Sequence, residues 1–135
     1  MINSIKKFFE KDRFANSLGI KLVRVEPGYA ETKMEIAERH LNAINIVQGG
    51  AIFTLADFAF AAASNADGKV TVGINANISY FKASKGKVLI AKAREVSGSK
   101  KIANYNVDVF DENNDLTAQL SLTGYVKEEK IDFNK

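Results

Sequence analysis

One stretch of the chain, residues 49–65, limits the possible fold more than any other. It reads Gly-Gly-Ala-Ile-Phe-Thr-Leu-Ala-Asp-Phe-Ala-Phe-Ala-Ala-Ala-Ser-Asn and contains no proline. Its richness in Ala, Leu and Phe predicts a helix of about four turns, opened by the glycine pair and closed by the turn residues 65–68. The helix is apolar around its whole circumference, which is typical of a helix that the rest of the protein encloses.

Asp57 is the only charged residue in this helix. An unpaired buried ion costs several kcal/mol, against a total stability of about 5–15 kcal/mol for a whole domain. Asp57 therefore either faces a polar cleft or a subunit interface, or is held neutral there by a raised pKa. A purely structural alternative also stays open, in which the carboxylate reaches solvent or bonds a backbone amide.

Length and composition predict a single domain over residues 1–135, because 46% hydrophobic content supplies one core. No apolar run approaches the ~20 residues that span a bilayer, and the N-terminus lacks the apolar region of a signal peptide. We therefore expect a cytoplasmic protein without membrane association. The chain has no cysteine and one histidine, so we expect no disulfide, no thiol catalysis, no metal site and no cofactor.

The net charge of +3 comes from 19 basic and 16 acidic residues scattered along the chain. The clustered Lys/Arg stripe of a nucleic-acid-binding protein is missing, so we expect no nucleic-acid partner and an ordinary solvated surface. A mildly basic surface is nevertheless compatible with an anionic ligand, whose approach it would steer.

The N-terminal half predicts a helix followed by a hairpin. Residues 4–17 have apolar positions at helical spacing and charged residues between them, which indicates one amphipathic helix on the outside of the core. Residues 20–26 and 29–37 are expected as strands joined by a Pro-Gly turn. Residues 38–48 show no clean period and lead directly into the long helix, as a functional loop does.

The C-terminal half alternates polar and apolar residues in four segments, at residues 70–81, 87–97, 101–110 and 116–126. Because the loops between them are short, we expect a four-stranded antiparallel meander. Residues 127–135 are charged and expected to fray. Together the elements predict an α+β fold, in which a curved antiparallel sheet wraps the long central helix and its outer face meets a partner subunit.

The element order and the string His40-x-Asn42-x5-Gln48-Gly49-Gly50-x5-Ala56-Asp57 resemble the hotdog-fold acyl-CoA thioesterases, in particular the phenylacetic-acid-degradation type. The resemblance extends from about residue 19 to residue 126. It implies hydrolysis of an acyl-CoA substrate to the free acid and CoA, with Asn42, Gly49 and Asp57 in the active site. It also implies a homodimer as the catalytic unit, often paired again into a tetramer.

The physical chemistry of these three residues is compatible with that activity. The N–H of Gly49 lies at the positive end of the helix dipole, where it can bind the oxyanion of a tetrahedral intermediate, an effect of about 3–4 kcal/mol per donor. Asn42 would orient the attacking water or bond the thioester. Asp57 would act as general base, or as a nucleophile that forms a mixed anhydride, and the sequence leaves both roles open.

The spacing of Gly49 and Asp57 adds a constraint of its own. The two residues are eight positions apart, which places them about 12 Å apart along one helix. They therefore cannot both touch one carbonyl carbon. If both act, Asp57 comes from a second copy of the chain whose helix runs antiparallel across a two-fold axis, which gives a homodimer with two composite sites.

Several positions depart from the family pattern. Gln48 stands where the family usually has histidine, and Ala43 stands where it usually has glycine. Gln48 keeps hydrogen-bonding capacity but cannot titrate. Gly73, with Asn75 nearby, falls where some members place a serine or threonine that positions water. With Gly50, these residues form the expected substrate-binding set: Gln48, Gly50, Gly73 and Asn75.

Other candidate residues have a structural reading beside the functional one. His40 lacks a partner acid and is expected to cap its loop. The aromatic residues near the helix either shape an acyl pocket or, more typically, fill the core; they are Phe53, Phe58, Phe60 and Tyr80. A lysine-bearing segment after the strand at 70–81 is a candidate for the CoA phosphates; its lysines are Lys82, Lys85 and Lys87.

Two functions from different classes remain. The first is the acyl-CoA thioesterase, and the second is a non-catalytic acyl-CoA-binding or regulatory protein on the same scaffold. Gln48 and Gly73 slightly favour the second. Asp57 favours the enzyme, because a binding protein gains nothing from a costly carboxylate beside an apolar pocket. Hydratase chemistry on a related fold needs a histidine–acid pair in the site, which this helix lacks.

Overall fold

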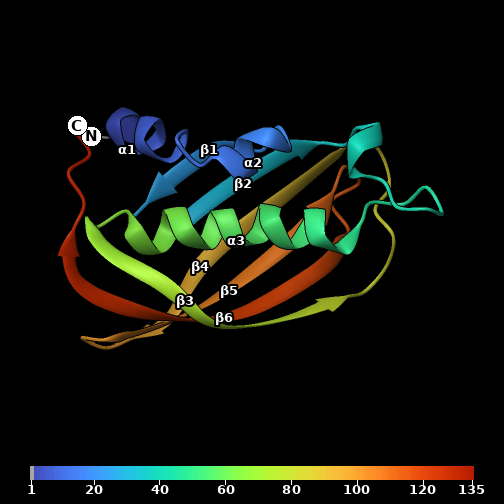
Figure 1. Ribbon diagram of the computed structural model, residues 1–135. Coiled ribbons are helices and arrows are strands. Elements are labelled where there is room, and N and C mark those ends of the chain that lie inside the picture. Colours follow the sequence, from blue (N-terminus) through green and yellow to red (C-terminus); the bar gives the residue numbers. More distant parts are fainter. Residues whose placement is uncertain (1) are drawn as a thin grey trace.

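A six-stranded antiparallel sheet curls around one long helix in the computed structural model, which describes residues 2–135 (Figure 1). The predicted α+β architecture is confirmed. The helices are α1 (Ile2–Phe9), α2 (Arg13–Ser17), the 3₁₀ turn η1 (Glu38–His40) and α3 (Gly49–Asn65). The strands are β1 (Lys21–Glu26), β2 (Tyr29–Glu35), β3 (Lys69–Tyr80), β4 (Val88–Gly98), β5 (Ile102–Asp111) and β6 (Leu116–Lys130).

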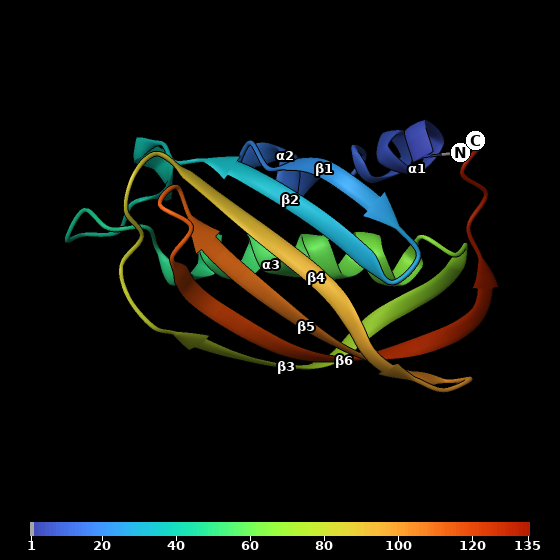
Figure 2. The same ribbon diagram turned by 180° about the vertical axis from the view of Figure 1, so that it is seen from behind.

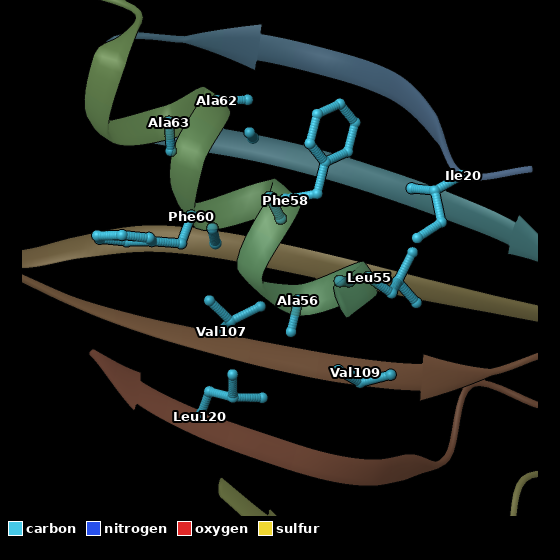
Figure 3. Close-up of a cluster of buried hydrophobic side chains, with 14 of the residues drawn as sticks. Ile20, Leu55, Ala56, Phe58, Phe60, Ala62, Ala63, Val107, Val109 and Leu120 are labelled. Carbon is cyan, nitrogen blue, oxygen red and sulfur yellow. The ribbon is translucent and has the colours of Figure 1, made fainter. Parts of the chain in front are cut away.

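Helix α3 forms the centre of the core and has the bounds that its composition predicts. Leu55 lies beside Ile20, and Leu120 of β6 lies on the other side of the helix from Phe58 (Figure 3). Phe58 packs edge-on against Phe9 of α1, with ring centroids 6.3 Å apart. Phe60 packs edge-on against Tyr105 of β5, with ring centroids 5.3 Å apart. Phe58 and Phe60 are thus core residues, as the more typical of the two readings predicts.

The strand order β1-β2-β4-β5-β6-β3 corrects the predicted four-stranded meander. Only β4, β5 and β6 form a meander, while β3 pairs with β6 at the far edge and β4 pairs with β2. The cause is the length of α3. A helix of 17 residues is about 25 Å long, so it carries the chain across several strands spaced about 4.8 Å apart before β3 begins.

The N-terminal segment forms two short helices, so the prediction of one helix over residues 4–17 was wrong. Helix α1 ends at Phe9, and α2 begins after Asp12, whose carboxylate accepts the N–H of Ala15 at 3.0 Å. Aspartate is among the preferred N-cap residues, because its side chain satisfies one of the free amides of a helix start. Asp12 therefore starts a new helix instead of continuing the old one.

The C-terminal segment is also better ordered than its charge suggests, so the prediction of fraying from residue 127 was wrong. Strand β6 continues to Lys130, which lies opposite Lys69 of β3. Beyond it, the ring of Phe133 packs edge-on against Phe8 of α1 at 5.5 Å (centroid to centroid). Burial of aromatic surface outweighs the local charge. Helix α1 and the last residues of the chain consequently lie side by side (Figures 1 and 2).

Strand β3 is an edge strand with an open outer side. Its apolar residues include Val72 and Ile74, which are 42% and 58% exposed. A bulge between Gly73 and Asn75 interrupts its register with β6. An exposed apolar edge strand offers unpaired backbone groups to another strand. No helix among residues 2–135 is long and apolar enough to cross a membrane.

The contact between the two chain ends gives a stability prediction. We expect Phe133→Ala to lower the free energy of unfolding by about 1–2 kcal/mol, because the half-buried ring loses its contacts with the rings of α1. Urea denaturation measures the change. Asn134→Ala, at an exposed neighbouring position, is the matched control. Equal stability of the two variants would contradict the docking of this segment.

Candidate active site

The start of helix α3 presents one backbone donor without a protein partner. Gln48 is the N-cap residue, and its Oε1 accepts the N–H of Gly50 at 2.7 Å. A Cβ on Gly50 would lie 2.6 Å from that oxygen, so glycine is needed for the cap. The N–H of Gly49 donates to no acceptor within residues 2–135. The positive end of the helix dipole thus keeps one free amide.

Tyr80, at the end of β3, fixes the other side of Gly49. Its hydroxyl donates to the carbonyl oxygen of Gly49 at 2.9 Å. A Cβ on Gly49 would lie 2.9 Å from the same hydroxyl, so a side chain at this position would push the tyrosine away. Tyr80 is 50% exposed and therefore not a core residue. Desolvation raises the pKa of its phenol, so the hydroxyl keeps its proton as a donor.

A cleft of about 720 Å³ opens beside this helix start, and we call it the helix-start cleft. Gln48, Gly50 and Phe53 line it, together with Tyr80. The other lining residues come from α2, from the loop before α3 and from α3 itself: Phe14, Leu18, Arg39, His40, Leu41, Ala51 and Thr54. Its walls combine apolar side chains with a few polar groups, as in small-molecule sites.

Phe14 and Leu18 are cleft residues that the sequence analysis missed. Phe14 is 65% exposed, although it lies on a helix that packs against α3. An exposed aromatic side chain in α2 was not detectable because the sequence predicted one continuous helix, whose apolar face differs from that of α2. The break at Asp12 is the signal that would have revealed it.

Asn42 shapes the loop before α3. Its Oδ1 accepts the N–H groups of Ile44 and Ile46 at 3.0 and 3.3 Å, and Asn45 between them has a positive φ of 61°. An asparagine side chain that bonds the backbone ahead of it is a common turn device. Asn42 is outside the lining of the helix-start cleft. Its predicted contact with water or substrate stays a prediction.

His40 is the buried anchor of the same loop. Its Nδ1 accepts the N–H of Ala37 at 2.9 Å, and its Nε2 lies 2.7 Å from the carbonyl oxygen of Leu18. The two contacts assign the neutral tautomer with the proton on Nε2. The prediction that His40 holds its loop is confirmed, and the bond to Leu18 also ties the loop to α2.

Asp57 lies on the one stripe of α3 that the rest of the chain leaves partly open. The stripe consists of Gly50, Thr54, Asp57 and Ala61, at helical spacing. The Asp57 carboxylate forms no hydrogen bond or ion pair with residues 2–135. Burial raises its pKa above the usual range, and the nearby Asp12 carboxylate raises it further. A carboxylate kept in such a place without a partner is typical of a functional site.

The structure does not bring all the predicted site residues together. Gln48 and Gly50 line the helix-start cleft. Gly49, between them, lies beside the cleft but outside its lining, and Asp57 is also outside it, two turns further along α3. Gly73 and Asn75 lie on the exposed edge strand β3. A single chain therefore contains two separate halves of the expected site.

The sequence of this chain matches a known protein family. The family profile described as "Thioesterase superfamily" matches residues 44–118, more than half of the chain. The chain belongs to this superfamily. The prediction of a thioester hydrolase with a hotdog fold is thereby confirmed.

The superfamily contains several close relatives of this chain. An esterase candidate of Archaeoglobus fulgidus is 38% identical over 127 residues, 93% of this chain and 82% of the relative. The acyl-coenzyme A thioesterase PaaI of Escherichia coli is 30% identical over 105 residues, 77% of this chain and 75% of its own. The solved structure of that PaaI has a TM-score of 0.90 and covers 96% of this chain and 95% of that chain.

A further structure contains a ligand. It is smu.793 of Streptococcus mutans bound to acetyl CoA, with 25% identity and a TM-score of 0.78 over 84% of this chain and 91% of that chain.

The unpaired carboxylate predicts a pH dependence of stability. Because its pKa is higher in the folded than in the unfolded chain, the folded protein binds more protons between the two values. The wild type therefore loses stability as pH rises through this window, above the ordinary value of 3.8. Asp57→Asn cannot lose stability in this way, because its amide does not ionise. Urea denaturation at pH 4 and pH 7 should show that the free energy of unfolding of the variant rises relative to that of the wild type. A difference between the two proteins that is the same at both pH values would contradict the burial of this charge.

Proposed function

We propose that this thioesterase hydrolyses an acyl-CoA to the free acid and CoA in composite sites of a homodimer. The observation that carries the proposal is the pair of unsatisfied groups on one apolar helix. These are the free N–H of Gly49 at its start and the unpaired carboxylate of Asp57 on its open stripe. One group stabilises negative charge and the other accepts a proton, which are the two requirements of thioester hydrolysis.

The reaction uses the two groups on opposite sides of one carbonyl. The thioester oxygen accepts the N–H of Gly49, and Asp57 of the second protomer takes a proton from the water that attacks the carbonyl carbon. The tetrahedral intermediate then breaks its C–S bond, and the proton passes to the CoA thiolate, which gives acid and thiol. In the alternative, Asp57 attacks directly and water hydrolyses the resulting mixed anhydride. The raised pKa of Asp57 favours proton acceptance near neutral pH.

Two surfaces support the dimer. The open edge of β3 offers apolar side chains and unpaired backbone groups, which a second β3 would cover. The open stripe of α3 needs a cover too, because it is otherwise an apolar surface with one costly charge. An antiparallel arrangement of two copies brings each Asp57 toward the Gly49 of the other. The acyl group would occupy the helix-start cleft, whose Phe14 and Phe53 are its aromatic walls.

Relatives support the same substrate class. The E. coli relative is named an acyl-coenzyme A thioesterase, and the S. mutans structure binds acetyl CoA. We retain the tetramer, the cytoplasmic location and the lack of membrane and nucleic-acid partners as predictions. The non-catalytic acyl-CoA-binding protein is the alternative that the experiments below exclude or support.

Thiol release from a panel of acyl-CoAs tests the activity. We expect wild type to hydrolyse at least one substrate and Asp57→Asn, which keeps the shape but removes the charge, to lose about 10²–10⁴-fold in kcat. Asp132→Asn makes the same chemical change at an exposed position outside the helix-start cleft; it is the matched control and should stay active. If wild type binds acyl-CoA without releasing thiol, the enzyme proposal is wrong and the binding protein takes its place.

Mixing two inactive variants tests the composite site. Gly49→Val blocks the donor by displacing Tyr80, and Asp57→Asn removes the base. In a mixed dimer one site carries both defects and the other carries none. Random mixing of refolded subunits should therefore restore roughly a quarter of wild-type activity, because half of the dimers are mixed and each has one intact site. Activity that stays absent in verified mixed dimers would place both groups in one protomer.

A further inference from the structure

One arginine on the wall of the helix-start cleft has no acidic partner. Arg39 belongs to the 3₁₀ turn η1, which stands at the end of the molecule where α3 begins (Figure 1). Its guanidinium forms no ion pair or hydrogen bond with residues 2–135. We propose that Arg39 binds a carboxylate at the far end of the acyl group, so that the preferred substrates are CoA monothioesters of dicarboxylic acids. This proposal rests on the proposed hydrolysis of an acyl-CoA.

The backbone holds Arg39 close to the start of α3. The N–H of Gln48 donates to the carbonyl oxygen of His40, the residue after Arg39, at 2.8 Å. Gln48 directly precedes Gly49, whose free N–H binds the thioester oxygen in the proposed reaction. The cleft in which we place the acyl group therefore has the carbonyl-binding donor beside it and the guanidinium of Arg39 on its wall.

The guanidinium lies against the backbone that follows α2. A Cβ on Gly19 would lie 2.5 Å from Nη2 of Arg39, and Gly19 has a positive φ of 73°. Glycine is the residue that adopts this conformation readily, and its missing side chain leaves room for the guanidinium. Arg39 is thereby placed beside α2, whose Phe14 also lines the cleft.

Two lysines add to the positive charge around Arg39. Arg39 also lines a second cavity of about 460 Å³, together with Lys21 and Lys33. These lysines lie directly opposite each other in the β1–β2 register, where like charges destabilise a sheet. Glu35 is the single acidic residue of this cavity, and none of the four side chains forms an ion pair with residues 2–135. Three positive charges against one negative charge favour an anionic group at this position.

The rest of the helix-start cleft suits the apolar part of such an acyl group. Phe14 and Phe53 contribute aromatic side chains to its lining, and Leu18 and Leu41 contribute aliphatic ones. The lining contains no acidic residue, and Arg39 is its only permanently charged one. A guanidinium binds a carboxylate through two parallel hydrogen bonds, which the ammonium of lysine does not reproduce. A methylene chain that ends in a carboxylate therefore matches both the walls and the charge.

Binding of two thioether analogues tests this assignment without requiring catalysis. They are S-hexyl-CoA and its counterpart with a carboxylate in place of the terminal methyl group. The test variants are Arg39→Gln, which removes the charge, and Arg39→Lys, which keeps the charge but loses the paired donors. Arg94→Gln is the matched control, because Arg94 is an exposed arginine of β4 outside both cavities. Calorimetric titration measures the two dissociation constants.

We expect the wild type to bind the carboxylate analogue more tightly than S-hexyl-CoA. Arg39→Gln should lower the ratio of the two affinities about tenfold, the effect of losing one hydrogen bond between charged groups, and should leave the affinity for S-hexyl-CoA unchanged. Arg39→Lys should keep part of the preference, and Arg94→Gln should match the wild type. With substrates, the same variants should raise KM for adipyl-CoA but not for hexanoyl-CoA, and kcat should not change.

Lys33→Gln separates a direct contact from a general effect of positive charge. Lys33 lies in the second cavity and outside the lining of the helix-start cleft, so its loss should lower the affinity ratio less than the loss of Arg39 does. An equal decrease in Lys33→Gln and Arg39→Gln would show that no specific contact at Arg39 exists and would overturn the proposal.

The outcomes also separate this proposal from the proposed function. Equal weakening of both analogues by Arg39→Gln would assign the arginine to CoA itself, and an unchanged ratio would leave it without a role; both results overturn the proposal, even if thiol release is observed. A selective loss of the carboxylate analogue supports the proposal even if the wild type releases no thiol from any acyl-CoA. In that case only the hydrolase proposal fails.

Discussion

The structure depends on the enclosure of one apolar helix. Helix α3 buries most of its surface against the concave face of the sheet, and the two N-terminal helices cover part of the rest. One stripe remains, and it carries the only charge of the helix. Apolar burial stabilises the fold in proportion to the area removed from water, whereas an unpaired carboxylate opposes it. The chain thus concentrates its least favourable group where a second molecule can reach it.

Helix α3 also determines the strand order of the sheet, which leaves β3 as an open edge strand. Because α3 crosses the sheet, β3 forms at the far edge next to β6 and not beside β4. The long edge that results is apolar, with Val72 and Ile74 exposed, which in a monomer would favour uncontrolled pairing. The antiparallel dimer that we propose would cover both the open edge and the open helix stripe. It would also join the two half-sites, which α3 keeps about 12 Å apart.

Local features of the fold could be predicted from the sequence, and long-range ones could not. The bounds of α3 follow from its composition and its flanking glycines, and the β1–β2 hairpin follows from its Pro-Gly turn. The position of β3 depends on helix length and sheet width, which no local pattern encodes. The hydrogen bond from Tyr80 to Gly49 and the packing of Phe133 on Phe8 join residues distant in the sequence. The cleft wall formed by Phe14 and Leu18 was missed because the helix break at Asp12 was not predicted.

The substitution at position 48 is better understood from hydrogen bonding than from titration. Gln48 uses Oε1 to cap the N–H of Gly50, which removes one of the free amides of the helix start. Gly49 then offers the free N–H beside the cleft, with its own carbonyl held by Tyr80. The orientation of the donor is set by two neutral side chains, neither of which changes charge near neutral pH. In the proposed mechanism, the proton transfer that hydrolysis requires therefore falls to Asp57, whose carboxylate lies on the open stripe of α3 with a raised pKa and without a partner among residues 2–135.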